Sequence, residues 1–98
     1  MKIQEWLTKT YEETPYSGFV RPRLACADGF TISVQASGYH YSTPRKNFQD
    51  GRMYTALELG FASMDDELIE DYSDGTVYPY VPVEIVDKLI KKHGGIVE

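Results

Sequence analysis

Apolar side chains at the start of the chain recur at the spacing of one helix face. They fall at positions i, i+3, i+4, i+7 and i+8, which places them on a single stripe. The stripe consists of Ile3, Trp6, Leu7, Thr10 and Tyr11. The pattern predicts a helix over residues 2–13. We expect it to end before Pro15, because the residue before a proline is pushed out of the α region, and Ser17-Gly18 then supplies a turn.

The strongest pattern is a pair of strand-like segments, residues 23–27 and 30–36, on either side of Asp28-Gly29. Asp-Gly between two such segments is typical of a two-residue type I′ turn, so we expect a tight hairpin in which Ala25 faces Ile32. One face, expected to meet the core, then consists of Ala25, Ala27, Phe30, Ile32, Val34 and Ala36. The other face is mixed and consists of Leu24, Cys26, Thr31, Ser33 and Gln35.

Beyond the hairpin the alternation fades, and residues 39–52 read as the end of a strand and a long loop. Alternation resumes over residues 54–61 and predicts a third strand. Ser63 followed by acidic residues favours a short helix over 64–72. A strand over 76–81 contains Pro79, which cannot donate to a ladder and therefore indicates a sheet edge.

A final helix is predicted from Pro82, which suits a first helical turn, to Gly94-Gly95, which suits a C-terminal stop. Its buried stripe consists of Val83, Val86, Leu89 and Ile90. The sequence thus predicts one α+β domain, residues 1–98, with a small antiparallel sheet of about four strands and N- and C-terminal helices. The order is α-β-β-β-α-β-α.

Composition fits an ordinary globular chain, with 42% hydrophobic and 26% charged residues. No segment approaches the roughly 18 apolar residues that span a bilayer, so we expect no membrane association. Cys26 is the only cysteine and cannot form an internal disulfide. A fold without disulfides suits a reducing compartment, and we expect the cytoplasm.

The net charge of −5 disfavours a general binder of the phosphate backbone, but the charges are segregated. Five basic and two acidic residues lie between Arg21 and Arg52, whereas seven acidic and no basic residues lie between Glu58 and Asp74. Two faces of opposite sign are expected.

Candidate chemistry is sparse. A Cys-His pair would need Cys26 beside His40 or His93, but Cys26 fits a buried strand position and His93 fits a helix C-terminus, where a cation is favoured. Metal-ligand spacings and phosphate-binding glycine motifs do not occur in the sequence. We therefore expect no enzymatic activity, no metal and no cofactor.

Eight tyrosines stand beside four phenylalanines. Tyrosine and arginine are enriched at protein interfaces, and the segment between Tyr39 and Arg52 concentrates them. The candidate binding residues are Tyr39, Tyr41, Arg45, Lys46, Phe48 and Arg52. Two alternatives stay open: the aromatic side chains cover the core, or they stack on nucleic-acid bases while the basic residues meet phosphates.

The acidic segment is a second candidate surface, because an array of carboxylates complements a basic groove on a partner. Its members are Asp65, Asp66, Glu67, Glu70 and Asp71. The plainer interpretation is an exposed, solvated helix face.

Five segments resemble a known group of proteins: residues 3–7, 15–20, 23–30, 33–37 and 80–84. They are similar to small proteins carried by phages, prophages and integrative elements of Gram-positive gut bacteria, a family with no assigned activity. The resemblance implies a mobile-element context. Accessory proteins of such elements are often inhibitors of host defence, including anti-CRISPR and anti-restriction proteins, which act by binding.

The leading hypothesis is a binding inhibitor of a host protein, such as a nuclease or another defence component. The alternative is a nucleic-acid or nucleotide-binding module that uses the Tyr39–Arg52 segment. A third hypothesis is a subunit whose open sheet face forms a homodimer.

Overall fold

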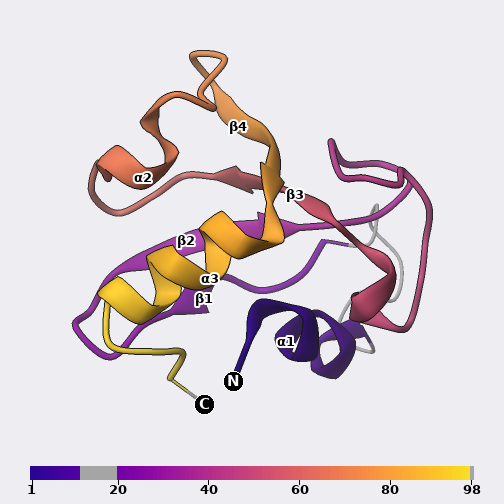
Figure 1. Ribbon diagram of the computed structural model, residues 1–98, viewed down its shortest axis with the longest axis horizontal. Helices are drawn as coiled ribbons and strands as arrows, with labels where there is room; N and C mark the ends of the chain where they lie inside the picture. Colours follow the sequence, from indigo (N-terminus) through magenta and orange to yellow (C-terminus); the bar gives the residue numbers. More distant parts are fainter. Residues whose placement is uncertain (12–19, 98) are drawn as a thin grey trace.

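The computed structural model describes residues 1–11 and 20–97 (Figure 1). The predicted α+β class and the order α-β-β-β-α-β-α are confirmed, with an additional short 3-10 helix. In chain order the elements are α1 (Ile3–Lys9), β1 (Leu24–Ala25), β2 (Thr31–Gln35), η2 (Gly51–Met53), β3 (Ala56–Gly60), α2 (Glu67–Glu70), β4 (Val77–Pro82) and α3 (Val83–Lys92). The predictions for Pro15 and Ser17-Gly18 lie outside the described residues.

The strands form one antiparallel sheet in the order β1-β2-β3-β4. β4 lies at an edge, as Pro79 predicted. Along the outer side of β1, the C-terminal segment pairs Ile96 with Cys26, and the Val97 N–H donates to the Ala25 carbonyl at 2.8 Å. This pairing fixes the segment that follows α3 beside the hairpin.

The hairpin between β1 and β2 forms, but its predicted register is wrong by one residue. Leu24 pairs with Ile32, and the Cys26 N–H donates to the Phe30 carbonyl at 2.8 Å. The loop is one residue longer than predicted and ends at Gly29, whose φ of +94° is the left-handed conformation that a three-residue hairpin loop needs. Leu24 and Cys26 therefore reach the core face, where they are 1% and 3% exposed. Burying them in place of two alanines removes more apolar area from water.

Helices α1 and α3 cover the sheet. Figure 1 shows α3 lying across the sheet with α1 below it in this view, and α1 packs on both α3 and η2. The predicted stripe of α3 is confirmed, since its buried residues are Val83, Val86, Leu89 and Ile90. α1 and the turn after it bury the first four predicted positions, Ile3, Trp6, Leu7 and Thr10, and Tyr11 is half-buried. Among the described residues, an apolar core joins these stripes to the strands.

Arg21 is hydrogen-bonded to Gln35, a buried residue of the predicted mixed face. The Arg21 N–H donates to Gln35 Oε1 at 2.7 Å, and Gln35 Nε2 donates to the Arg21 carbonyl at 2.9 Å. The Arg21 guanidinium donates to Thr10 Oγ1 at 3.0 Å and to the carbonyls of Ala36 and Leu7 at 2.8 and 3.1 Å. Arg21 is 3% exposed, so this buried cation ties α1 to the end of β2 through neutral oxygens.

The helix predicted over residues 64–72 is shorter, because Ser63, its expected N-cap, is hydrogen-bonded to β2 instead. The Thr31 N–H donates to Ser63 Oγ at 2.9 Å, and the Ser63 N–H donates to the Thr31 carbonyl at 2.8 Å. α2 therefore begins later, with Asp66 as its N-cap accepting from the Leu68 N–H at 3.0 Å.

Candidate functional site

The loop between β2 and η2 is fixed against the sheet, although most of it has no regular structure. The Tyr41 N–H donates to Glu58 Oε1 at 2.8 Å. The Thr43 N–H donates to the Ala56 carbonyl at 2.9 Å, and the Thr55 N–H donates to the Thr43 carbonyl at 2.8 Å. These bonds join the loop to β3, so its side chains are presented from an ordered backbone.

Tyr41, Arg45 and Tyr80 form an exposed group that we call the tyrosine–arginine cluster. The rings of Tyr41 and Tyr80 have centroids 5.9 Å apart and are tilted by 50°. The Arg45 guanidinium carbon lies 5.1 Å from the Tyr41 ring centroid, within the range of a cation–π contact. Tyr41 and Tyr80 are 43% and 46% exposed despite these contacts. The cluster thus presents two phenol rings and a cation to solvent.

A β-bulge in β4 places Tyr80 in the cluster. Leu57 pairs with Val81 but Leu59 pairs with Tyr78, so β4 carries an extra residue opposite β3. Tyr80 has a φ of +55°, and its N–H donates to the Tyr41 carbonyl at 3.1 Å. A non-glycine residue in this region costs about 1–3 kcal/mol and persists where the surroundings hold it.

The structure brings together only part of the predicted binding segment. Tyr41 and Arg45 are in the cluster, and Tyr39 and Lys46 are exposed on the same loop. Phe48 lies outside the cluster: it is half-buried and packed against the core, and the centroid of its ring lies 5.7 Å from that of Tyr54, edge to face. Its role in binding stays a prediction.

Arg52 does not join the cluster either. Its guanidinium pairs with Asp50 at 2.9 Å beside the 3-10 helix, where both side chains are exposed. The hydrogen bonds from Arg52 hold the pKa of Asp50 below its usual range. This pair lines a pocket together with Glu5 and Thr8 of α1.

The residues of the predicted acidic surface also differ in exposure. Its exposed members are Asp65, Glu67, Glu70 and Asp71. The placement of Asp66 on that surface is wrong, because its side chain is only 2% exposed. Asp66 is engaged by the N-terminus of α2 and by Lys92 and His93.

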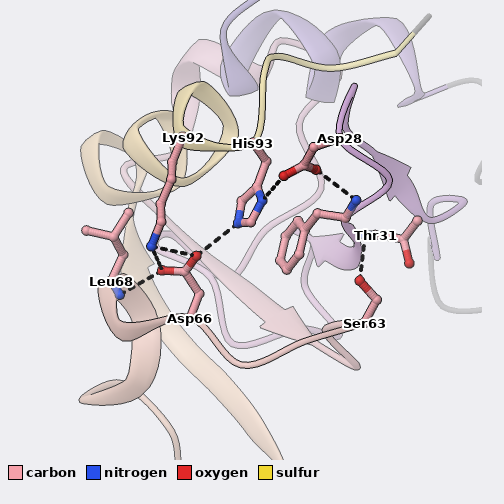
Figure 2. Close-up of polar contacts among 8 residues, drawn as sticks. Asp28, Thr31, Ser63, Asp66, Leu68, Lys92 and His93 are labelled. Carbon is pink, nitrogen blue, oxygen red and sulfur yellow. Dashed lines mark hydrogen bonds and ion pairs between the residues drawn. The ribbon is translucent and has the colours of Figure 1, made fainter.

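Sequence reasoning missed Tyr80 and the contacts of His93. His93 is the C-cap of α3, which fits the predicted helix-end position. In Figure 2 its ring points between Asp28 and Asp66, at 2.6 and 2.9 Å. These partners are 65 and 27 residues away in the sequence, so no local spacing signals them.

Within residues 1–11 and 20–97, no group of three or more His, Cys, Asp or Glu side chains is placed to hold a metal ion. In the same part of the chain, no helix combines the length and apolar character that a membrane crossing requires. No protein-family model, curated protein or solved structure matches this chain.

Proposed function

We propose that this chain is a binding protein that inhibits a bacterial target protein, with the tyrosine–arginine cluster as its contact surface. The observation that carries the proposal is the pairing of Tyr41 with Tyr80 beneath Arg45, exposed on an ordered backbone. Tyrosine and arginine dominate the binding energy of protein interfaces, because they supply large contact areas with polar tips.

The ordering of the loop supports this role. Binding requires side chains and loops to lose conformational freedom, at about 0.5–1.5 kcal/mol for each immobilised side chain. Here Tyr41 is already held by Glu58 through its N–H and by Tyr80 through its carbonyl. The surface is therefore organised before a partner arrives.

The backbone strain at Tyr80 is a second supporting observation. Glycine would occupy a φ of +55° without strain, yet a large aromatic residue stands there with its ring at the cluster. Strained residues concentrate at functional sites. Phe61 has a similar φ of +52° outside the cluster, so the strain supports the proposal only together with the contact between the Tyr80 and Tyr41 rings. A role in contacting a partner gives this tyrosine a reason beyond folding.

The charge of the surface indicates the chemistry of the partner. Arg45 and Lys46 are exposed basic residues on the loop, in a chain whose net charge is −5. A protein with acidic groups around an apolar patch complements this surface, and charge complementarity speeds the encounter. Phe48 faces the core and Arg52 is paired with Asp50, which leaves fewer groups for stacking and phosphate contacts and favours a protein over nucleic acid.

The biological setting of the proposal is defence inhibition by a mobile element. Resemblance to proteins of phages and integrative elements supports an anti-CRISPR-like or anti-restriction-like factor that blocks a nuclease or another defence component. Such factors act by occupying a surface of the target, which requires no catalytic group of their own.

The test is inhibition of a target captured from host lysate and then purified. The wild-type chain is expected to bind and inhibit it, and Tyr41→Ala combined with Tyr80→Ala to lose both effects. Phe61→Ala is the matched control: Phe61 is also an exposed aromatic residue at positive φ (52°), but it lies outside the cluster.

Equal inhibition by the double variant and the control would overturn the proposed surface. Tight binding of single-stranded oligonucleotides that Arg45→Ala and Lys46→Ala abolish, with no protein captured, would replace a protein target with nucleic acid. Circular dichroism and thermal unfolding establish that each variant is folded.

A further inference from the structure

His93 joins three parts of the fold that are distant in the sequence. It stands at the C-terminal end of α3, Asp28 lies in the hairpin loop, and Asp66 caps α2 (Figure 2). Its Nδ1 lies 2.6 Å from Asp28 Oδ2 and its Nε2 lies 2.9 Å from Asp66 Oδ2. The side chains of His93 and Asp66 are 7% and 2% exposed, whereas that of Asp28 is 46% exposed.

The two contacts decide the protonation state of the ring. A carboxylate oxygen only accepts hydrogen bonds, and a neutral imidazole donates through only one nitrogen. Both contacts are hydrogen bonds at once only if the ring is an imidazolium or one carboxyl is protonated.

The surroundings favour ionised carboxylates and a cationic ring. Asp28 accepts from the Phe30 N–H at 2.9 Å, and Asp66 accepts from the Leu68 N–H at 3.0 Å and from Lys92 Nζ at 3.2 Å. The Phe30 ring stacks on the His93 ring at 4.0 Å, with 9° between their planes. A cation over an aromatic ring is stabilised by the negative electrostatic potential of the ring face.

We propose that His93 is a pH-sensitive clasp: as an imidazolium it holds the hairpin loop, the N-terminus of α2 and the end of α3 together, and loss of its proton loosens all three. A backbone hydrogen bond also links the hairpin loop to the end of α3, because the Asp28 N–H donates to the His93 carbonyl at 3.1 Å. α2 carries the exposed acidic residues Glu67 and Glu70, so the clasp also governs how firmly that acidic surface is held.

The charged and titratable groups around the ring agree with this assignment. Burial disfavours the charged form of His93, but hydrogen bonds to Asp28 and Asp66 outweigh it and raise the pKa above 6.5. Hydrogen bonds from the Phe30 N–H and His93 lower the pKa of Asp28. Burial works against ionisation of Asp66, but bonds from Leu68, His93 and Lys92 together lower its pKa. The Cys26 thiol, two residues before Asp28 in the hairpin, has a pKa raised by burial and by that carboxylate.

The direction of the pH dependence follows from these shifts. His93 contributes its stabilisation fully below pH 6.5 and loses it as the pH rises through the raised pKa of the folded state. Asp28 and Asp66 contribute above pH 3.8 and lose their part as the pH falls through their lowered pKa values. The clasp is therefore closed at pH values between the lowered pKa values of the two aspartates and the raised pKa of His93. It opens when the pH rises above the pKa of His93.

The direct test is nuclear magnetic resonance of the full chain with isotopically labelled histidine. His40 is an internal control, because burial lowers its pKa, and Arg21 and Arg45 lower it further against the opposing effect of Glu58. It should therefore titrate below pH 6.5 and His93 above it. At about pH 6 we expect both ring nitrogens of His93 to carry protons. A neutral single tautomer at that pH, or titration of His93 at or below pH 6.5, would overturn the clasp.

A variant without the charge of His93 tests how that charge contributes to the pH dependence of thermal stability. The proposal predicts that the thermal midpoint of wild type declines as the pH rises through the titration of His93. His93→Gln keeps a hydrogen-bonding side chain without the charge and should abolish that decline, whereas His40→Gln should keep it. An identical decline in His93→Gln would refute the assignment. The resonance titration needs no variant and decides the matter if His93→Gln does not fold.

Discussion

Replacing Asp66 by asparagine separates the charge of this buried carboxylate from its capping role. Asparagine caps helices about as well as aspartate, so the bond from the Leu68 N–H at 3.0 Å is retained. The negative charge beside His93 is removed. A buried hydrogen bond between charged groups contributes about 1.5–3 kcal/mol. The Lys92 side chain is 46% exposed, so its contact adds about 1 kcal/mol at most.

We therefore expect Asp66→Asn to lower the free energy of unfolding by about 1.5–4 kcal/mol at about pH 6. Urea denaturation followed by circular dichroism measures it. The matched control is Asp65→Asn, an exposed neighbour, which should change stability by less than about 0.5 kcal/mol.

The pH dependence of this loss separates the charge from a general packing defect. Above the titration of His93 the wild-type ring is neutral, so the difference between wild type and Asp66→Asn should shrink. A loss of the same size on both sides of that titration, or a loss no larger than that of the control, would refute the reasoning.

Two further predictions concern the attachment of α1. A Cβ at Gly51 would clash with the backbone oxygen of Gln4, so Gly51→Ala should lower the free energy of unfolding by about 1–3 kcal/mol. A Cβ at Gly60 would have its nearest contact at an ordinary 3.5 Å, so Gly60→Ala should not lower it in this way. The guanidinium of Arg21 donates hydrogen bonds to three oxygens in different directions, which a lysine ammonium cannot reach together. Arg21→Lys should therefore lower the free energy of unfolding by about 2–4 kcal/mol. Arg23→Lys, at an exposed position, should have a small effect. Denaturant unfolding tests both pairs, and equal losses within either pair would contradict these contacts.

The order of elements could be predicted because the apolar spacing of the helices and the turn residues act locally. The hairpin register could not be fixed by Asp28-Gly29 alone, because the same two residues fit a two-residue loop and the end of a three-residue loop. Comparing the areas that each register buries would have favoured the observed one, since it places Leu24 and Cys26 against the core. Global packing thus overrides the local turn signal.

The candidate site was only partly predictable for the same reason. Tyr41 and Arg45 are close in sequence and were predicted together, but Tyr80 reaches them through a bulge in another strand. Asp66 reads as a surface residue beside its acidic neighbours, and only its position opposite His93 explains its burial. Contacts between distant segments carry both features, and no pattern within one segment encodes them.

The most direct test of the proposed binding surface is site-specific photo-crosslinking in host cells. A photoreactive phenylalanine at position 80 would lie in the tyrosine–arginine cluster, and the same residue at position 61 would be exposed at a similar positive φ outside it. The proposal predicts a single protein adduct from position 80, none from position 61, and inhibition of that protein by the purified wild-type chain. Adducts of the same protein from both positions, or inhibition with no adduct from position 80, would contradict it.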